Sequence, residues 1–163
     1  FFLFSIYISN FFKWDANEHG PLMVEKYGFK EAEKPFERTY RRMSNLDDMH
    51  ENGIHDYMKW VKFGYGRATD HTSKDIRGGN MSREQGIKEV LNRDHIKSED
   101  LHRWLDYVGW SEEEFDRNAD NFRDSSVWWI RGDQWCKTDI DGVERTHGKV
   151  NLLNSEKSKF FQD

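Results

Sequence analysis

Hydrophobic residues recur at helical spacing through the middle of the chain. One helical turn holds 3.6 residues, so apolar side chains on one face return every three or four positions. Residues 46–61 follow this pattern behind Asn45, which predicts an N-cap and a helix that Gly64 ends. The apolar positions of this helix are Leu46, Met49, Ile54, Tyr57, Met58 and Val61.

Two pairs of polar residues predict where further helices begin. In a capping box a Ser or Thr and a Glu or Gln three residues later satisfy each other's backbone N–H groups. Ser82 with Gln85 and Ser111 with Glu114 have this spacing. Each pair precedes apolar residues at helical spacing, which are Ile87, Val90 and Leu91 for the first and Phe115 and Phe122 for the second.

Two other helices are bounded less sharply. Ser98 predicts the start of a helix that Gly109 ends. Near the N-terminus, Asp15 or Asn17 predicts the start of a helix that ends at Gly28. Pro21 is expected in the first turn of that helix, where a residue without an N–H is tolerated. The apolar residues behind Ser98 are Leu101, Trp104, Leu105 and Val108.

Elsewhere the pattern favours strands. Residues 4–12 are mostly apolar and predict an N-terminal strand. Residues 127–136 predict a β-hairpin, with its turn at 131–133. Beyond Asp139 little apolar periodicity remains, so residues 139–163 are expected to be a divergent, weakly ordered tail to a region 1–138. The predicted class is mainly α, with a short β-hairpin and an N-terminal strand.

Composition narrows the function classes. The 163 residues are enough for one domain with a core, and 15% of them are aromatic. The net charge of -5 argues against a dedicated nucleic-acid binder, which usually carries a basic excess. Cys136 is the only cysteine, so no internal disulfide forms, and a buried structural thiol is expected. We expect no membrane span and a cytoplasmic location.

One motif suggests a metal site and does not meet its requirement. A zinc-protease helix needs two histidines at i and i+4, so that both face one ion. His50 and His55 are five residues apart, which points their rings in different directions. The sequence therefore predicts no metal site.

Residues 63–83, FGYGRATDHTSKDIRGGNMSR, gather charged and hydroxyl side chains between glycines. Arg67, Arg77 and Arg83 are expected to converge on a phosphate or carboxylate, because guanidinium binds such anions with two parallel hydrogen bonds. Acidic and imidazole groups between them, Asp70, His71 and Asp75, are candidates for proton transfer or orientation. A salt-bridged surface connection would explain the same composition, and the residues alone do not separate the two.

The run HENGIHDYMKWVKFGYGRATDHTSKDIRGGNMSREQGI, with KWDANEHGPLMVEKYGFK upstream, resembles the C-terminal part of the bacterial N-acetyl sugar amidotransferases. The resemblance covers roughly residues 7 to 138. These enzymes are similar to the PP-loop ATP pyrophosphatases and act in lipopolysaccharide (LPS), O-antigen and related glycan synthesis. The fold class thereby implied is the C-terminal part of an α/β PP-loop enzyme, similar to the adenine nucleotide alpha hydrolases.

The resemblance implies an ATP-dependent, ligase-type reaction on a nucleotide sugar. ATP, with Mg, activates the oxygen of an N-acetyl group as an adenylate, and ammonia then displaces AMP to leave an acetamidino group. The implied partners are a glutaminase subunit and a synthase-like subunit that channels the ammonia. The family's ATP-binding signature, SGG-x-DS, is absent from this chain and would lie upstream. We therefore expect a fragment that is inactive alone.

The resemblance also suggests roles for residues. Arg67 and Arg77 are expected to bind phosphate, and Asp70 and His71 to orient the acetamido group or transfer a proton. A second set of substrate-binding candidates is Lys62, Ser73, Asp75 and Arg83, with Glu51 and His55 on the preceding helix. The alternative is a non-catalytic helical module that docks the ammonia-supplying partners.

Overall fold

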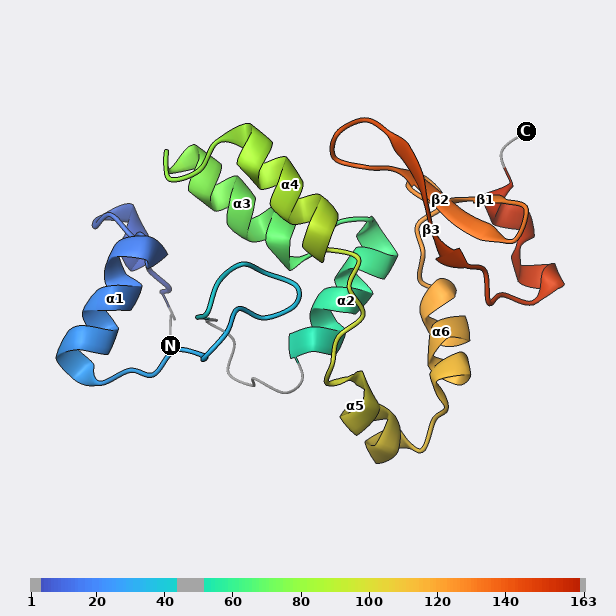
Figure 1. Ribbon diagram of the computed structural model, residues 1–163, viewed down its shortest axis with the longest axis horizontal. Coiled ribbons are helices and arrows are strands. Elements are labelled where there is room, and N and C mark those ends of the chain that lie inside the picture. The colour runs from blue at the N-terminus through green and yellow to red at the C-terminus, as the bar shows by residue number, and fades with distance from the viewer. Residues whose placement is uncertain (1–3, 44–51, 162–163) are drawn as a thin grey trace. The chain divides into compact units, whose positions relative to one another are not determined.

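The computed structural model describes residues 4–43 and 52–161, in two compact units that divide between Lys34 and Pro35. The described residues form six α-helices and one three-stranded antiparallel sheet (Figure 1). The predicted mainly helical class with a β-hairpin is confirmed at this level. α1 belongs to the N-terminal unit, and the other five helices and the sheet belong to the C-terminal unit.

The predicted N-terminal strand is wrong. Residues 4–12 contain a 3-10 helix at Ile8–Asn10 and no strand. Their backbone bonds are local, with Asn10 N donating to Tyr7 O at 3.0 Å and Phe11 N to Ile8 O at 2.9 Å. A strand requires a partner for its backbone groups, and in the described part of this segment none is paired in a sheet.

α1 spans Ala16–Tyr27 and confirms the predicted end signals. The Asp15 side chain accepts from Asn17 N at 2.9 Å, and Gly28 takes the left-handed conformation with φ 67°. Pro21 lies beyond the first turn, because the helix begins five residues before it.

The C-terminal unit holds the other helices, whose starts confirm both predicted capping boxes. Ser82 accepts from Gln85 N and Ser111 from Glu114 N, each at 3.2 Å. The predicted cap Asn45 and the apolar positions Leu46 and Met49 lie outside the described residues. The helices are α2 Asn52–Phe63, α3 Arg67–Arg77, α4 Arg83–Arg93, α5 Leu101–Val108 and α6 Glu112–Asp120.

Most of the charged stretch at residues 63–83 is helical, because residues 67–77 form α3. Its first turn is capped from α4's end by the Asp94 carboxylate, which accepts from Gly66 N and Ala68 N at 2.8 Å and from the Thr69 backbone and hydroxyl. α3 and α4 lie side by side as an antiparallel pair (Figure 1). Gly86 permits this close packing, since a Cβ there would lie 2.7 Å from the Cδ1 of Ile76.

Two details of the last helices differ from prediction. α5 begins at Leu101, after Asp100, so Ser98 is not its N-cap. The Ser98 hydroxyl is buried instead. Phe122 follows the end of α6 and its side chain is 58% exposed, so it contributes no buried face to that helix.

The sheet has one strand more than the predicted hairpin. β1 (Trp129–Arg131) and β2 (Gln134–Thr138) pair around the expected turn, where Gly132 has φ 65°. β3 (Glu144–Lys149) then pairs with β2, in the segment expected to be weakly ordered. The expectation of a tail without regular structure is thus wrong for residues 139–161, which also form the 3-10 helices Asn154–Glu156 and Ser158–Phe160. The boundary after residue 138 stays a prediction.

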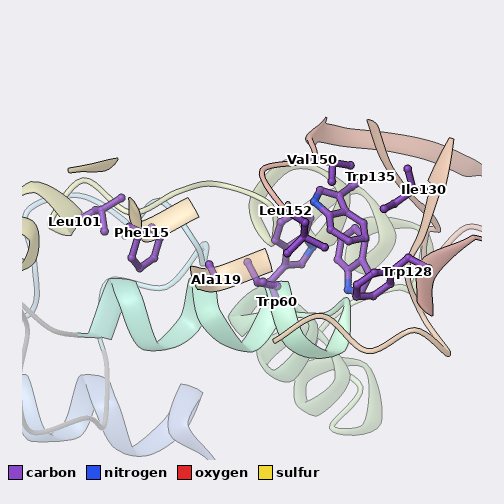
Figure 2. Close-up of a cluster of buried hydrophobic side chains, with 11 residues drawn as sticks. Trp60, Leu101, Phe115, Ala119, Trp128, Ile130, Trp135, Val150 and Leu152 are labelled. Atoms are coloured by element: carbon purple, nitrogen blue, oxygen red, sulfur yellow. The ribbon is translucent and has the colours of Figure 1, made fainter. Parts of the chain in front are cut away.

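The core joins the helices to the sheet. Figure 2 shows its labelled side chains running from Leu101 and Phe115 at the helical end to Trp128, Ile130 and Trp135 at the sheet. The same core buries Val150, Leu152 and Phe160, which explains why the C-terminal segment is held against the sheet. The predicted buried thiol is confirmed, since Cys136 is 1% exposed.

Candidate functional site

Four of the predicted site residues line one groove on the C-terminal unit. The groove has a volume of about 460 Å³, within the range of ligand pockets. α2 and the start of α3 form most of its wall. The lining residues are His55, Met58, Lys59, Lys62, Phe63, Arg67, Asp70 and Phe122.

Arg67 is held rigidly at the edge of this groove. Its Nε and Nη2 donate to the same oxygen of Asp56, Oδ1, at 2.9 and 2.6 Å. Asp56 is buried, and the Nε of Arg38 lies 3.5 Å from its other oxygen. The Nη1 of Arg67 makes no hydrogen bond within the described ranges, so it can donate to an anion in the groove.

Two lysines add positive charge from α2. Lys59 forms an ion pair with Asp70, and its Nζ lies 4.6 Å from the ring centroid of Tyr65. Lys62 is exposed, with its Nζ 4.9 Å from the ring centroid of Phe63. Three basic side chains therefore face the groove together with one carboxylate, in a chain whose net charge is -5.

His71 and Asp75 lie on the buried face of α3 and do not line this groove. The Nδ1 of His71 is 2.6 Å from the hydroxyl of Thr39. Asp75 accepts from the Tyr40 hydroxyl and, at 2.6 Å, from Nη2 of Arg41. These contacts tie the segment around residues 39–41 to α3.

Burial lowers the pKa of His71 to about 4, and the nearby positive charges of Arg41, Arg67 and Lys74 act in the same direction. His71 is therefore neutral at pH 7. Burial also raises the pKa of Tyr40, with the hydrogen bond to Asp75 adding to the shift. The network is thus held by neutral His71 and Tyr40 beside the ion pair of Arg41 and Asp75.

The predicted convergence of three arginines is wrong for one physical reason. Residues 67–77 form a helix, so Arg67 and Arg77 stand at its opposite ends, about 15 Å apart along the axis. Arg77 and Arg83 are exposed near the connection between α3 and α4 and do not line the groove. Ser73 is half-buried on α3 away from the groove, and Glu51 lies outside the described residues.

Sequence reasoning missed residues that organise the site. Lys59 could have been found, because His55, Lys59 and Lys62 are spaced four and three apart and so share one face of α2. Asp56 and Asp94 gave no such signal. Arg67 lies 11 residues from Asp56, and the partners of Asp94 lie 25 to 28 residues from it, at distances in sequence that helical periodicity does not cover.

The neutral state of His71 predicts a loss of stability on mild acidification. Its pKa is about 4 in the folded chain and 6.5 unfolded, so between these values the unfolded state binds the extra proton. Stability is full above pH 6.5 and falls as the pH drops toward 4. Denaturant unfolding at pH 7 and pH 5 should show a loss of about 2 kcal/mol from this residue.

The matched variants are His71→Gln and, as a control, His102→Gln on the exposed face of α5. For His71→Gln, the free energy of unfolding should differ less between pH 7 and pH 5 than it does in the wild type. For His102→Gln, the difference should equal that of the wild type. An unchanged difference in His71→Gln would contradict the buried neutral state.

Within the described ranges, no group of three or more His, Cys, Asp or Glu side chains is arranged to hold a metal ion. None of the helices there combines the length and the apolar character that crossing a bilayer requires.

Comparison with known families gives one match. The family described as "LPS biosynthesis protein WbpG-like, C-terminal domain" matches residues 33–139. The match therefore covers the described part of the segment around residues 39–41, helices α2 to α6 and strands β1 and β2. No curated protein matches the chain.

Proposed function

Because the chain belongs to the family of WbpG-like C-terminal domains of LPS biosynthesis proteins, we propose that it is the substrate-binding part of an ATP-dependent N-acetyl sugar amidotransferase. The enzyme would act in the cytoplasm and convert the acetamido group of a nucleotide sugar to an acetamidino group. The reaction rests on the resemblance of residues 7 to 138 to those enzymes.

The groove on α2 and α3 carries the proposal. Nucleotide sugars bear a diphosphate, and phosphate oxygens are bound by guanidinium and ammonium groups. Lys59, Lys62 and Arg67 supply these groups, and Asp56 orients Arg67 so that Nη1 faces away from the ion pair. Phe63 and Phe122 add apolar surface beside the charges, as ligand sites commonly do.

The remaining groups have positioning roles in this proposal. Asp70 pairs with Lys59 and so places its ammonium group at the groove wall. His71 is neutral and buried, and its hydrogen bond to Thr39 fixes the position of α3 against the preceding segment. Asp70 and His71 were both predicted to transfer a proton. Only Asp70 is within reach of a ligand in the groove, since Asp70 lines the groove and His71 does not.

ATP would supply the leaving group, and ammonia from the glutaminase and synthase-like partners would displace AMP. The chain has no SGG-x-DS loop, the phosphate-binding signature of the amidotransferases that it resembles. We therefore assign no ATP-dependent step to residues of this chain. Its proposed contribution is to bind and orient the nucleotide sugar.

Pyrophosphate binding tests the groove directly. In calorimetric titration of the 163-residue chain, we expect Arg67→Met and Lys62→Met each to weaken pyrophosphate binding about tenfold, as loss of one charge-assisted contact does. Arg103→Met, on the exposed surface of α5, is the matched control and should bind as the wild type. In the complete enzyme, Arg67→Ala should abolish amidination.

Far-ultraviolet circular dichroism and a thermal melt would show that each variant is folded. Wild-type binding that is undetectable, or that Arg67→Met leaves unchanged, would contradict the substrate-binding proposal.

That outcome would favour the second candidate, a module that docks the ammonia-supplying subunits. One observation supports it, since exposed contiguous apolar surface marks interaction sites. The N-terminal unit exposes a run of large apolar side chains, namely Phe4, Ile6, Tyr7, Ile8, Phe11, Phe12 and Trp14.

A further inference from the structure

A second cavity of about 370 Å³ lies in the C-terminal unit between the end of α2, α4 and the turn that joins β2 to β3. On the helical side its lining includes three aromatic side chains, those of Trp60, Phe63 and Tyr65. Phe63 and Tyr65 are each 43% exposed, and their ring centroids are 6.1 Å apart. Exposed aromatic rings at a cavity mouth are surfaces on which a planar ligand can stack.

The lining of this cavity also holds a polar cluster with little solvent exposure, in which the ring of His147 lies 5.5 Å from that of Trp60. Asp139 Oδ1 accepts from the Nζ of Lys137 at 2.6 Å and lies 3.0 Å from the Nε2 of His147. Lys137 also donates to Thr138 O at 3.1 Å, which leaves one ammonium proton without a partner in the described chain. Lys137 is only 5% exposed, although its charge would favour water.

His147 presents a hydrogen-bond acceptor in the same cluster. Burial lowers its pKa, so the ring is neutral at pH 7. When Nε2–H donates to Asp139, Nδ1 is an acceptor, and in the described chain it makes no hydrogen bond. The lining of the cavity therefore combines a donor on Lys137, an acceptor on His147 and the exposed aromatic rings of Phe63 and Tyr65.

The cavity and the cationic groove adjoin each other. Phe63 lines both. Tyr65 lines the cavity, and the Nζ of Lys59, which lines the groove, lies over its ring. A ligand with a planar polar ring at one end and anionic groups at the other would match this pair of sites.

We propose that the cavity binds the base of a nucleoside diphosphate whose phosphates lie in the groove of Lys59, Lys62 and Arg67. This inference rests on the proposed function, because it takes the groove as a phosphate site. A nucleobase stacks on Tyr65, one of its acceptors receives a hydrogen bond from Lys137, and one of its N–H groups donates to Nδ1 of His147. A nucleotide sugar and ATP both contain such a group.

Titration calorimetry of the full chain with uridine diphosphate, adenosine diphosphate and pyrophosphate tests the inference. At least one nucleotide should bind about tenfold more tightly than pyrophosphate, which is the scale of one stacked base. The preferred nucleotide identifies the source, uridine diphosphate for a sugar nucleotide and adenosine diphosphate for ATP.

Two variants separate the base site from the phosphate site. Tyr65→Ala should weaken binding of the preferred nucleotide about tenfold and leave pyrophosphate binding unchanged. His147→Leu should do the same, and the exposed position of Tyr65 keeps the test valid if His147→Leu does not fold. Tyr107→Ala is the matched control, because Tyr107 on α5 is 88% exposed and lines neither site.

Equal affinities for nucleotides and pyrophosphate, or a Tyr65→Ala chain that binds nucleotides as the wild type does, would overturn the base site while leaving the phosphate groove intact. Failure of pyrophosphate to bind in an Arg67-dependent manner would overturn the groove itself. The two failures are therefore distinguishable.

Discussion

Replacement of Arg123 by methionine is expected to lower the free energy of unfolding by about 4 kcal/mol, the range observed when one partner of a buried ion pair is removed. Arg123 is 6% exposed, and its Nε donates to Oδ1 of Asp120 at 2.8 Å. Asp120 is 3% exposed and would be left as a buried carboxylate without its cation.

The surroundings of Arg123 add to this effect. Its guanidinium carbon lies 4.1, 4.7 and 5.6 Å from the ring centroids of Trp128, Trp135 and Trp60. Such contacts stabilise a desolvated cation, because the faces of aromatic rings are negative. The other oxygen of Asp120 accepts from Asn151 N at 2.8 Å, so the pair also holds the segment after β3.

Denaturant unfolding of Arg123→Met measures the effect. The double variant Arg123→Met with Asp120→Asn should recover part of the lost stability, because it no longer buries a lone carboxylate. Arg103→Met, on the surface of α5, should unfold at nearly the wild-type midpoint. A loss in Arg123→Met no larger than in Arg103→Met would show that the ion pair contributes nothing.

Replacement of Asp94 by alanine is expected to cost about 3 kcal/mol of stability and to weaken ligand binding in the groove. The Asp94 carboxylate caps α3 from outside that helix, through Gly66 N, Ala68 N and both donors of Thr69. An N-cap contributes about 1 kcal/mol, and each buried donor left unpaired costs about 1–3 kcal/mol. Gly66 and Ala68 are buried, so their N–H groups would lose their acceptor in a poorly solvated site.

The Asp94→Ala substitution is expected to weaken binding because Asp94 caps the turn that carries two residues of the groove. Arg67 and Asp70 stand in the first turn of α3, the turn that Asp94 caps. Pyrophosphate titration and denaturant unfolding of Asp94→Ala would measure the two effects together, and Asp106→Ala on the exposed surface of α5 is the control. Wild-type stability in Asp94→Ala would contradict the capping role. If a destabilised Asp94→Ala chain bound pyrophosphate as the wild type does, binding in the groove would not depend on the cap.

The helices predicted from capping boxes were found where expected, and the strand at residues 4–12 was not. A capping box is local, because its donors and acceptors lie within three residues, as at Ser82 and Ser111. A strand depends on partners elsewhere, and apolar runs read alike in strands and other buried segments. The same dependence explains why β3 escaped prediction, since Arg145 and Thr146 pair with residues of β2 rather than following an apolar pattern.

The sequence indicated residues 63–83 as part of the candidate site, but the predicted convergence of their three arginines was wrong. Arg67 and Asp70 line the groove as predicted residues, together with His55 and Lys62 from α2. Arg77 and Arg83 do not, because the intervening residues form a helix that separates them from Arg67. The functional roles of these residues stay predictions until the titrations are made.

Local chemistry in the sequence by itself determined the ends of α1, the starts of α4 and α6 and the turn between β1 and β2, since each depends on residues within a few positions of one another. Only the tertiary structure decided that residues 67–77 form a helix, because its cap is the distant Asp94. It also decided which cations share a groove, because Lys59 and Arg67 meet only when α2 and α3 pack together. Burial of Val150, Leu152 and Phe160 likewise decided the structure of the C-terminal segment, through contacts that no local pattern encodes.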